Sequence, residues 1–191
     1  FADDAAHGLA RVERAERVLE HHLEAGPRTP QRGSVQRIQV LPAQAHRLRS
    51  EFCIAVTGVV AGAAQGDPLD PATVFGPVAH RGQFDSVLEH LASARAEGAR
   101  FMAGGDVVPG PGLFIAPSVL ADVTPEMRVA REEIFGPVAT IQPYETVEEA
   151  LEIANSTPFG LGGIVFSADE ERAFAVAELV DSGSVGVNFF A

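Results

Sequence analysis

The sequence contains no lysine and only one cysteine. All fourteen cationic residues are arginines, which excludes a Walker-type phosphate loop and a lysine Schiff base. Cys53 has no second cysteine with which to form a disulfide within the chain, and one cysteine cannot build a zinc cluster. His21 and His22 are adjacent rather than four residues apart, so they do not place two imidazoles on one helix face. We therefore expect no metal site.

Positive charge and long apolar runs are also scarce. The formal net charge is -12, whereas a surface that binds nucleic acid needs clustered cations. No apolar run approaches the roughly 20 residues of a membrane span, and the first residues lack the layout of a signal peptide. We expect a cytoplasmic protein without nucleic-acid or membrane partners. Because the chain begins at Phe1 without an initiator methionine, we also expect it to be a piece of a longer protein.

Beyond residue 35, the sequence alternates between strand-like and helix-like segments. Strand patterns occupy residues 37–41, 138–143, 162–166 and 184–189. Apolar residues recur at helical spacing in four stripes, at Leu48, Phe52, Ala55, Val56 and Val59; at Phe84, Val87, Leu88 and Leu91; at Val147, Ala150, Leu151 and Ala154; and at Ala173, Val176, Ala177 and Val180. This alternation predicts an α/β fold with crossover helices on a parallel sheet. We expect burial of Phe52, Val56, Leu88, Leu151, Val176 and Val180.

Several short motifs indicate local structure. Thr146 with Glu149, and Ser167 with Glu170, have the spacing of capping boxes and predict two helix starts. Asn188 is expected to end a strand with bonds from its side chain to the backbone. The acidic and proline residues of 66–71 predict successive turns rather than a cation site, and the glycines of 160–163 lead into a strand rather than a phosphate-binding helix.

The first 35 residues differ from the rest of the chain. They carry five arginines and three histidines among sparse apolar positions, and Pro27 and Pro30 interrupt any helix there. We interpret residues 1–35 as an atypical segment that is poorly ordered or packs unusually. A damaged or frame-shifted version of a more regular segment is a further interpretation of residues 5–35.

A series of motifs follows in order along residues 36–191. They are 66–73 (GDPLDPAT), 76–77 (GP), 104–105 (GG), 114–119 (FIAPSV), 132–138 (EEIFGPV), 154–161 (ANSTPFGL) and 183–188 (GSVGVN). This ordered set resembles the catalytic domain of the aldehyde dehydrogenase superfamily. The resemblance implies a Rossmann-like, three-layer αβα catalytic domain with a mainly parallel sheet, incomplete at residues 36–191. It also implies that the 133–138 loop lies at a carboxyl-end crevice of the sheet.

The resemblance also implies which chemistry should be present. The family oxidises an aldehyde through a cysteine thioester, beside a nicotinamide cofactor. Matching the strand that follows this cysteine to residues 36–40 places Arg32 at the nucleophile, or Gly33 and Ser34 after a shift of the loop, and none is a thiol. Cys53 lies about twenty residues later inside an amphipathic helix, as a structural cysteine would. The family's glutamate base and dinucleotide domain are expected upstream of this chain, so we assign no catalytic residue.

One wall of a cofactor site is implied within residues 132–138. The resemblance assigns Glu133 to the nicotinamide ribose hydroxyls, because a carboxylate accepts two hydrogen bonds from a vicinal diol. It places Phe135 beside the same ribose and the nicotinamide. The alternative is that Glu133 is a solvated loop carboxylate and Phe135 a core anchor. The implied cofactor is NAD or NADP, with weak or no binding by this chain alone.

Two functional hypotheses follow. The first is a fragment or relic of an NAD(P)-dependent aldehyde dehydrogenase, an oxidoreductase that converts an aldehyde to a carboxylic acid, inactive as this chain alone. The alternative is a non-catalytic scaffold or regulatory module of the same fold. In either case we expect self-association through apolar surface and the sheet edge near residues 184–189.

Overall fold

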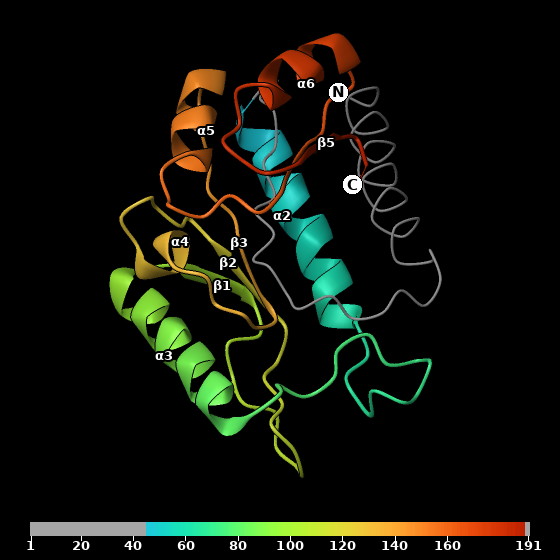
Figure 1. Cartoon of the computed structure of the whole chain (residues 1–191). Coiled ribbons are helices and arrows are strands. Elements are labelled where there is room, and N and C mark those ends of the chain that lie inside the picture. The colour runs from blue at the N-terminus through green and yellow to red at the C-terminus, as the bar shows by residue number, and fades with distance from the viewer. Residues whose placement is uncertain (1–44, 190–191) are drawn as a thin grey trace, which may run out of the picture.

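The computed structural model describes residues 45–189, with side chains from Cys53 onward (Figure 1). The helices are α2 (Ala45–Gly62), α3 (Arg81–Glu97), α4 (Arg128–Arg131), α5 (Val147–Ala154) and α6 (Glu170–Ala177). The strands are β1 (Arg100–Ala103), β2 (Ser118–Ala121), β3 (Val138–Thr140), β4 (Gly163–Val165) and β5 (Val185–Val187). The predictions for residues 1–35, for the strand at 37–41 and for Phe52 lie outside the described residues or side chains. No helix of the described part is both long and apolar enough to cross a bilayer.

The strands form two small sheets. In the first, β2 lies between β1, which runs antiparallel to it, and β3, which runs parallel. In the second, β4 and β5 pair in parallel and α6 connects them. The predicted α/β class is thus confirmed for the described residues. Two of the three strand pairings are parallel, as predicted. The strands nevertheless form two separate small sheets rather than one, and β1 pairs with β2 in antiparallel orientation.

Helices cover both faces of the first sheet. Val119 and Ala121 of β2 pack with Cys53 and Val56 of α2. Leu120, which points to the other face, joins the larger apolar cluster that α3 builds from four buried positions, Phe84, Val87, Leu91 and Ala94. Figure 1 shows α2 and α3 on opposite sides of β1–β3. All four residues of β2 are therefore buried.

A smaller cluster surrounds the second sheet. Val165 of β4 and Val187 of β5 pack against Ala173 and Val176 of α6, with Leu151 and Val180 partly buried at its edge. Of the six residues expected to be buried, Val56 and Val176 are buried, whereas Leu88, Leu151 and Val180 are half-buried. The helical spacing of the apolar residues thus identified the correct buried face of these helices. Residues at the edge of each apolar cluster remain partly exposed to solvent.

Most of the predicted local motifs are confirmed. Thr146 Oγ1 accepts a hydrogen bond from the Glu149 amide at 3.2 Å and begins α5. The carboxylates of Asp67 and Asp70 accept bonds from amides two residues ahead, which makes residues 67–73 successive turns. Asn188, in the left-handed region at φ 58°, closes the end of β5.

The predicted capping box at Ser167 is wrong. Asp169 caps α6, because its Oδ1 accepts from the Arg172 amide at 3.0 Å. The backbone of Ser167 is already engaged by the Asn188 side chain, which accepts from its amide and donates to its carbonyl, both at 2.9 Å. The helix consequently starts two residues later than the sequence spacing predicted.

The loop between β1 and β2 contains a contact that only glycine permits. Gly105 adopts φ 96°, and a Cβ atom there would lie 2.5 Å from Cδ1 of Phe101 and 2.6 Å from Nη2 of Arg95. The same Arg95 guanidinium stacks over the Phe101 ring, with 4.4 Å to its centroid, and donates to the Gly105 carbonyl. This arrangement ties the loop to α3 and β1.

We predict that Gly105→Ala lowers the free energy of unfolding by ~1–3 kcal/mol more than Gly98→Ala, because only the first variant overpacks its surroundings. Gly98 is the matched control, since its φ of 92° carries similar strain while nothing lies within 4 Å of the added Cβ. Urea unfolding followed by circular dichroism measures both. Equal losses would contradict the role of the Phe101 and Arg95 contacts.

Candidate cofactor-contacting site

The site predicted from sequence lies on the segment that leads from α4 into β3. Ile134 is fully buried and fixes this segment to the core. Phe135 adopts φ 50°, a left-handed conformation that is rare for a bulky residue. Pro137 joins the first sheet, because its carbonyl accepts from the Ser118 amide at 2.8 Å. The segment precedes β3, so it lies at the amino ends of β2 and β3, and the predicted carboxyl-end position is wrong.

Helix α3 contacts the segment over most of its length. The Gln83 side-chain nitrogen Nε2 donates to the carbonyls of Ile134 and Phe135, at 3.0 and 2.9 Å. A Cβ atom on Gly136 would lie 2.6 Å from Cγ2 of Val87. Together these contacts leave little freedom in the backbone on the β3 side of Glu133.

The amino-terminal part of the segment is held by charge. His90 is 3% exposed, with Nδ1 2.7 Å from the Ser86 carbonyl and Nε2 3.2 Å from Oε2 of Glu132. Arg128 donates to the same Glu132 oxygen at 2.9 Å. The hydrogen bond from Arg128 is the main reason that the pKa of Glu132 is lowered, with a smaller contribution from His90. Glu132 is thus a structural anion rather than a proton donor at neutral pH.

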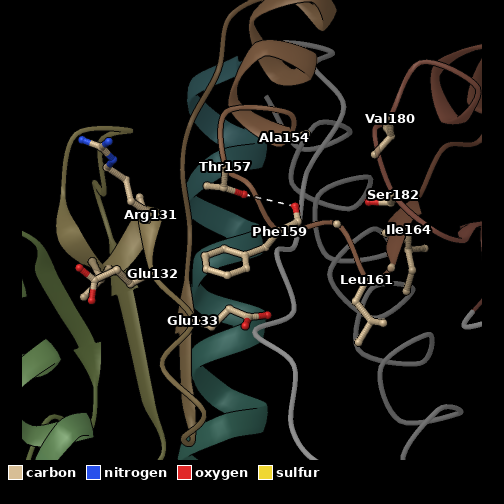
Figure 2. Close-up of a pocket in the computed structure, with 15 residues that line it drawn as sticks. Arg131, Glu132, Glu133, Ala154, Thr157, Phe159, Leu161, Ile164, Val180 and Ser182 are labelled. Carbon is tan, nitrogen blue, oxygen red and sulfur yellow. Dashed lines mark hydrogen bonds between the residues drawn. The ribbon is translucent and has the colours of Figure 1, made fainter.

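Glu133 lines a pocket between the segment that precedes β3 and the residues around β4 of the second sheet. The cavity measures about 100 Å³, and its walls come from residues 129–133, from residues 159–164 and from Ala154, Thr157, Val180 and Ser182. Figure 2 shows the Glu133 side chain directed to the same side as Phe159, while Arg131 and Glu132 project the other way. Glu133 is half-buried. The lining also includes Arg131, Glu132, Thr157 and Ser182, so the Glu133 carboxylate lies among glycine backbone, apolar side chains and a few polar groups.

Phe135 does not line this pocket. Phe135 is 48% exposed, so its alternative interpretation as a core anchor is wrong, and Ile134 takes that role. The structure places Glu133 and Phe135 two residues apart on one rigid segment. It does not bring their side chains into a common cavity.

Cys53 lies in the interior of α2, where 5% of its surface is exposed. It packs with Val56 and Val119, and its carbonyl accepts a bond from the Thr57 hydroxyl at 2.6 Å. This burial agrees with the interpretation of Cys53 as a structural residue. Within residues 45–189, no group of three or more histidine, cysteine or acidic side chains is placed to hold a metal ion.

Gln83, His90 and Arg128, which position the segment, were not predicted from the sequence. Gln83 and His90 stand on the α3 face that also carries Val87 and Leu91, at helical spacing. The available signal was the presence of a glutamine and a histidine on the apolar face of a helix, where a polar side chain needs a hydrogen-bond partner. Their partners lie 42 to 52 residues away in sequence, and helical periodicity gives no information about such contacts.

The fold is similar to that of solved aldehyde dehydrogenases, including structures solved in complex with NAD+. An aldehyde dehydrogenase from Pseudomonas syringae, solved with NAD+ and octanal, is 36% identical with a TM-score of 0.73 over 77% of this chain and 31% of that one. A Mycobacterium tuberculosis aldehyde dehydrogenase complexed with NAD+ is 39% identical, with a TM-score of 0.72 over 75% of this chain and 30% of that one.

The particular family is given by sequence. Residues 37–191 match the model of the aldehyde dehydrogenase family. A betaine aldehyde dehydrogenase from Cereibacter sphaeroides is 45% identical over 125 residues, which cover 65% of this chain and 26% of that protein. The chain belongs to the aldehyde dehydrogenase family, and it spans about a quarter of the length of that curated relative.

We predict that Glu132→Gln lowers the melting temperature at pH 7 and that this loss shrinks as the pH falls below about 4.5, the ordinary pKa of a glutamate. The sign follows from linkage, because a carboxyl group whose pKa is lowered in the folded state stabilises the fold only while it is ionised. Thermal unfolding between pH 3 and 7 measures it. Glu89→Gln, an exposed change on the same helix as His90, is the control. A loss that stays constant over this range would contradict the charge-based role.

Proposed function

We propose that this chain supplies the nicotinamide-ribose wall of an NAD+ or NADP+ site in an aldehyde-oxidising dehydrogenase. The observation that carries the proposal is the half-buried Glu133 carboxylate, which lines a pocket and sits on a segment fixed by α3. The NAD+ complexes of the Pseudomonas and Mycobacterium relatives support it. The parent reaction would convert an aldehyde, water and NAD(P)+ to a carboxylic acid, NAD(P)H and a proton.

The residues present fit the ribose end of such a cofactor. A carboxylate has only acceptor sites, and it accepts two hydrogen bonds from the neighbouring hydroxyls of a ribose. Glu133 provides this group beside the glycine-rich backbone of residues 160–163. The exposed Phe135 ring offers an apolar face two residues further on. When bound, the cofactor would supply the hydride acceptor.

This chain alone is not expected to turn over aldehydes. Cys53 is its only thiol, and it is buried between α2 and the first sheet. A thioester route needs an accessible, ionisable thiol. We infer that this chain lacks the catalytic thiol, since the family's nucleophile position matches Arg32, Gly33 or Ser34, and that the family's glutamate base is not among its residues. We also infer that β1–β3 and β4–β5 are parts of one Rossmann-like αβα catalytic domain.

The proposal predicts weak cofactor binding that depends on Glu133. We expect a dissociation constant for NAD+ no tighter than about 1 mM, equivalent to ~4 kcal/mol. Glu133→Gln should weaken it roughly tenfold or more, because the amide keeps one acceptor oxygen and loses the second charge-assisted hydrogen bond, which contributes about 1.5–3 kcal/mol. Calorimetry and NMR titration measure the affinity. Glu152→Gln, an exposed change on α5, is the control, and micromolar affinity or indifference to Glu133→Gln would refute the proposal.

A scaffold function is the second candidate, favoured by exposed apolar side chains around the second sheet. Leu161, Phe174 and Leu179 are 57% to 76% exposed, and Phe189 is 54% exposed. Among the described residues, β5 pairs with β4 alone and forms a sheet edge. Apolar patches and unpaired strand edges are typical of surfaces that meet another chain. We infer that copies of this chain associate here.

We predict a dimer or larger species whose population rises with concentration and with salt, since salt screens the repulsion between chains of charge -12. Sedimentation velocity measures it. The double variant Phe174→Ser and Leu179→Ser should shift the population toward monomer. Leu69→Ser, at an 89% exposed residue of the distant 67–73 turns, should not. A wild-type monomer at high concentration and moderate salt would exclude this association.

A further inference from the structure

One face of α3 meets the site segment through three residues at helical spacing. Gln83, Val87 and His90 follow each other at steps of four and three, so they lie on the same side of the helix. Gln83 reaches Ile134 and Phe135, Val87 meets Gly136, and His90 reaches Glu132. The three contacts cover the segment on both sides of Glu133. None of these α3 residues belongs to the pocket lining.

The contact from Gln83 is the most specific of the three. Its side-chain amide nitrogen lies 3.0 Å from the Ile134 carbonyl oxygen and 2.9 Å from that of Phe135. An amide NH₂ group has two donor hydrogens, so it satisfies both oxygens at once. These carbonyls belong to consecutive peptide units that flank the Phe135 Cα atom. One side chain therefore fixes the orientation of both peptide planes.

The conformation that Gln83 holds is one that the backbone does not favour. A left-handed backbone costs a non-glycine residue about 1–2 kcal/mol, and Phe135 adopts it at φ 50°. Such conformations persist when surrounding contacts determine them. Here the surrounding contacts are the two bonds from Gln83 and the close approach of Gly136 to Val87, where a Cβ would be only 2.6 Å from Cγ2. Without the amide donors, the backbone at Phe135 is free to leave the left-handed conformation.

The turn decides where the candidate cofactor-contacting groups lie. Glu133 is followed by Ile134, which is fully buried, and preceded by Glu132, which His90 and Arg128 hold. A rotation of the peptide planes at Phe135 would redirect its exposed ring and pull on the backbone next to Glu133. Geometry errors near 1 Å are enough to lose much of the benefit of a positioned group.

We propose that Gln83 is a positioning residue for the cofactor site. Its amide fixes the left-handed turn at Phe135, so that Glu133 and Phe135 meet the nicotinamide ribose in a preset geometry. This inference rests on the proposed function of Glu133. Gln83 acts through the backbone of Ile134 and Phe135 and itself makes no contact with the ribose.

The test compares Gln83→Leu and Gln83→Glu with the wild-type chain. Both variants keep the approximate shape of the side chain and remove the amide donors. Gln65→Leu is the matched control, because Gln65 Nε2 also donates to a distant backbone carbonyl, that of Ile115, at 2.8 Å. Carbonyl ¹³C shifts of Ile134 and Phe135 report the hydrogen bonds without ligand. Titration with NAD+ and saturation transfer to its nicotinamide-ribose protons report the site.

We expect both Gln83 variants to move the two carbonyl shifts, to weaken NAD+ roughly tenfold, equivalent to ~1.4 kcal/mol, and to lose saturation at the ribose protons. Gln65→Leu should change neither readout, even if it lowers stability. If Gln83→Leu does not fold, Gln83→Glu decides. Unchanged affinity and ribose saturation in a folded Gln83 variant, with wild-type binding present, would overturn this inference alone. Absence of ribose saturation in the wild type would overturn the proposed function and this inference with it.

Discussion

The burial of Ser118 at the start of β2 is the constraint on which the rest of the described fold depends. The residue is 1% exposed, and a buried hydroxyl group without partners would cost about 1–3 kcal/mol. Its Oγ accepts from the Gly105 amide at 2.8 Å and donates to the Ala116 carbonyl at 2.7 Å, while its amide binds the Pro137 carbonyl. The β1–β2 loop and the entry of β3 are thereby fixed to one point. Ser118 thus fixes the β3 end of the segment that carries Glu133, and the α3 contacts fix the rest of it.

Sequence pattern was sufficient for the helices and insufficient for the sheets. The apolar stripes identified α2, α3, α5 and α6, because one face of each helix is buried and the other is solvated. The strands β1 and β2 were missed. β2 is four residues long and buried throughout, so it lacks the alternation that marks a half-exposed strand. That β1 pairs with it in antiparallel orientation depends on contacts that no local pattern records.

At the candidate site, too, the sequence predicted some residues and missed those whose role depends on distant contacts. Glu133 and Phe135 were assigned to a cofactor site by resemblance alone. The structure adds where they lie: Glu133 is half-buried in a pocket and Phe135 is on the surface. Gln83 and His90 were not found, because their importance comes from partners on a distant segment. In this lysine-free chain, arginine makes two kinds of contact at once. Arg95 stacks on an aromatic ring and donates to a carbonyl at the same time, which the point charge of a lysine would not reproduce.

The left-handed backbone at Phe135 has a consequence for how this chain can change in evolution. Glycine adopts such a conformation without steric cost, so a glycine at this position would make the folded state more stable and remove the exposed ring. On the proposed function, selection for stability and selection for the ring would act in opposite directions at this single residue. Substitutions elsewhere that add stability, for example in the cluster around Leu120, would offset the strain and let the phenylalanine persist.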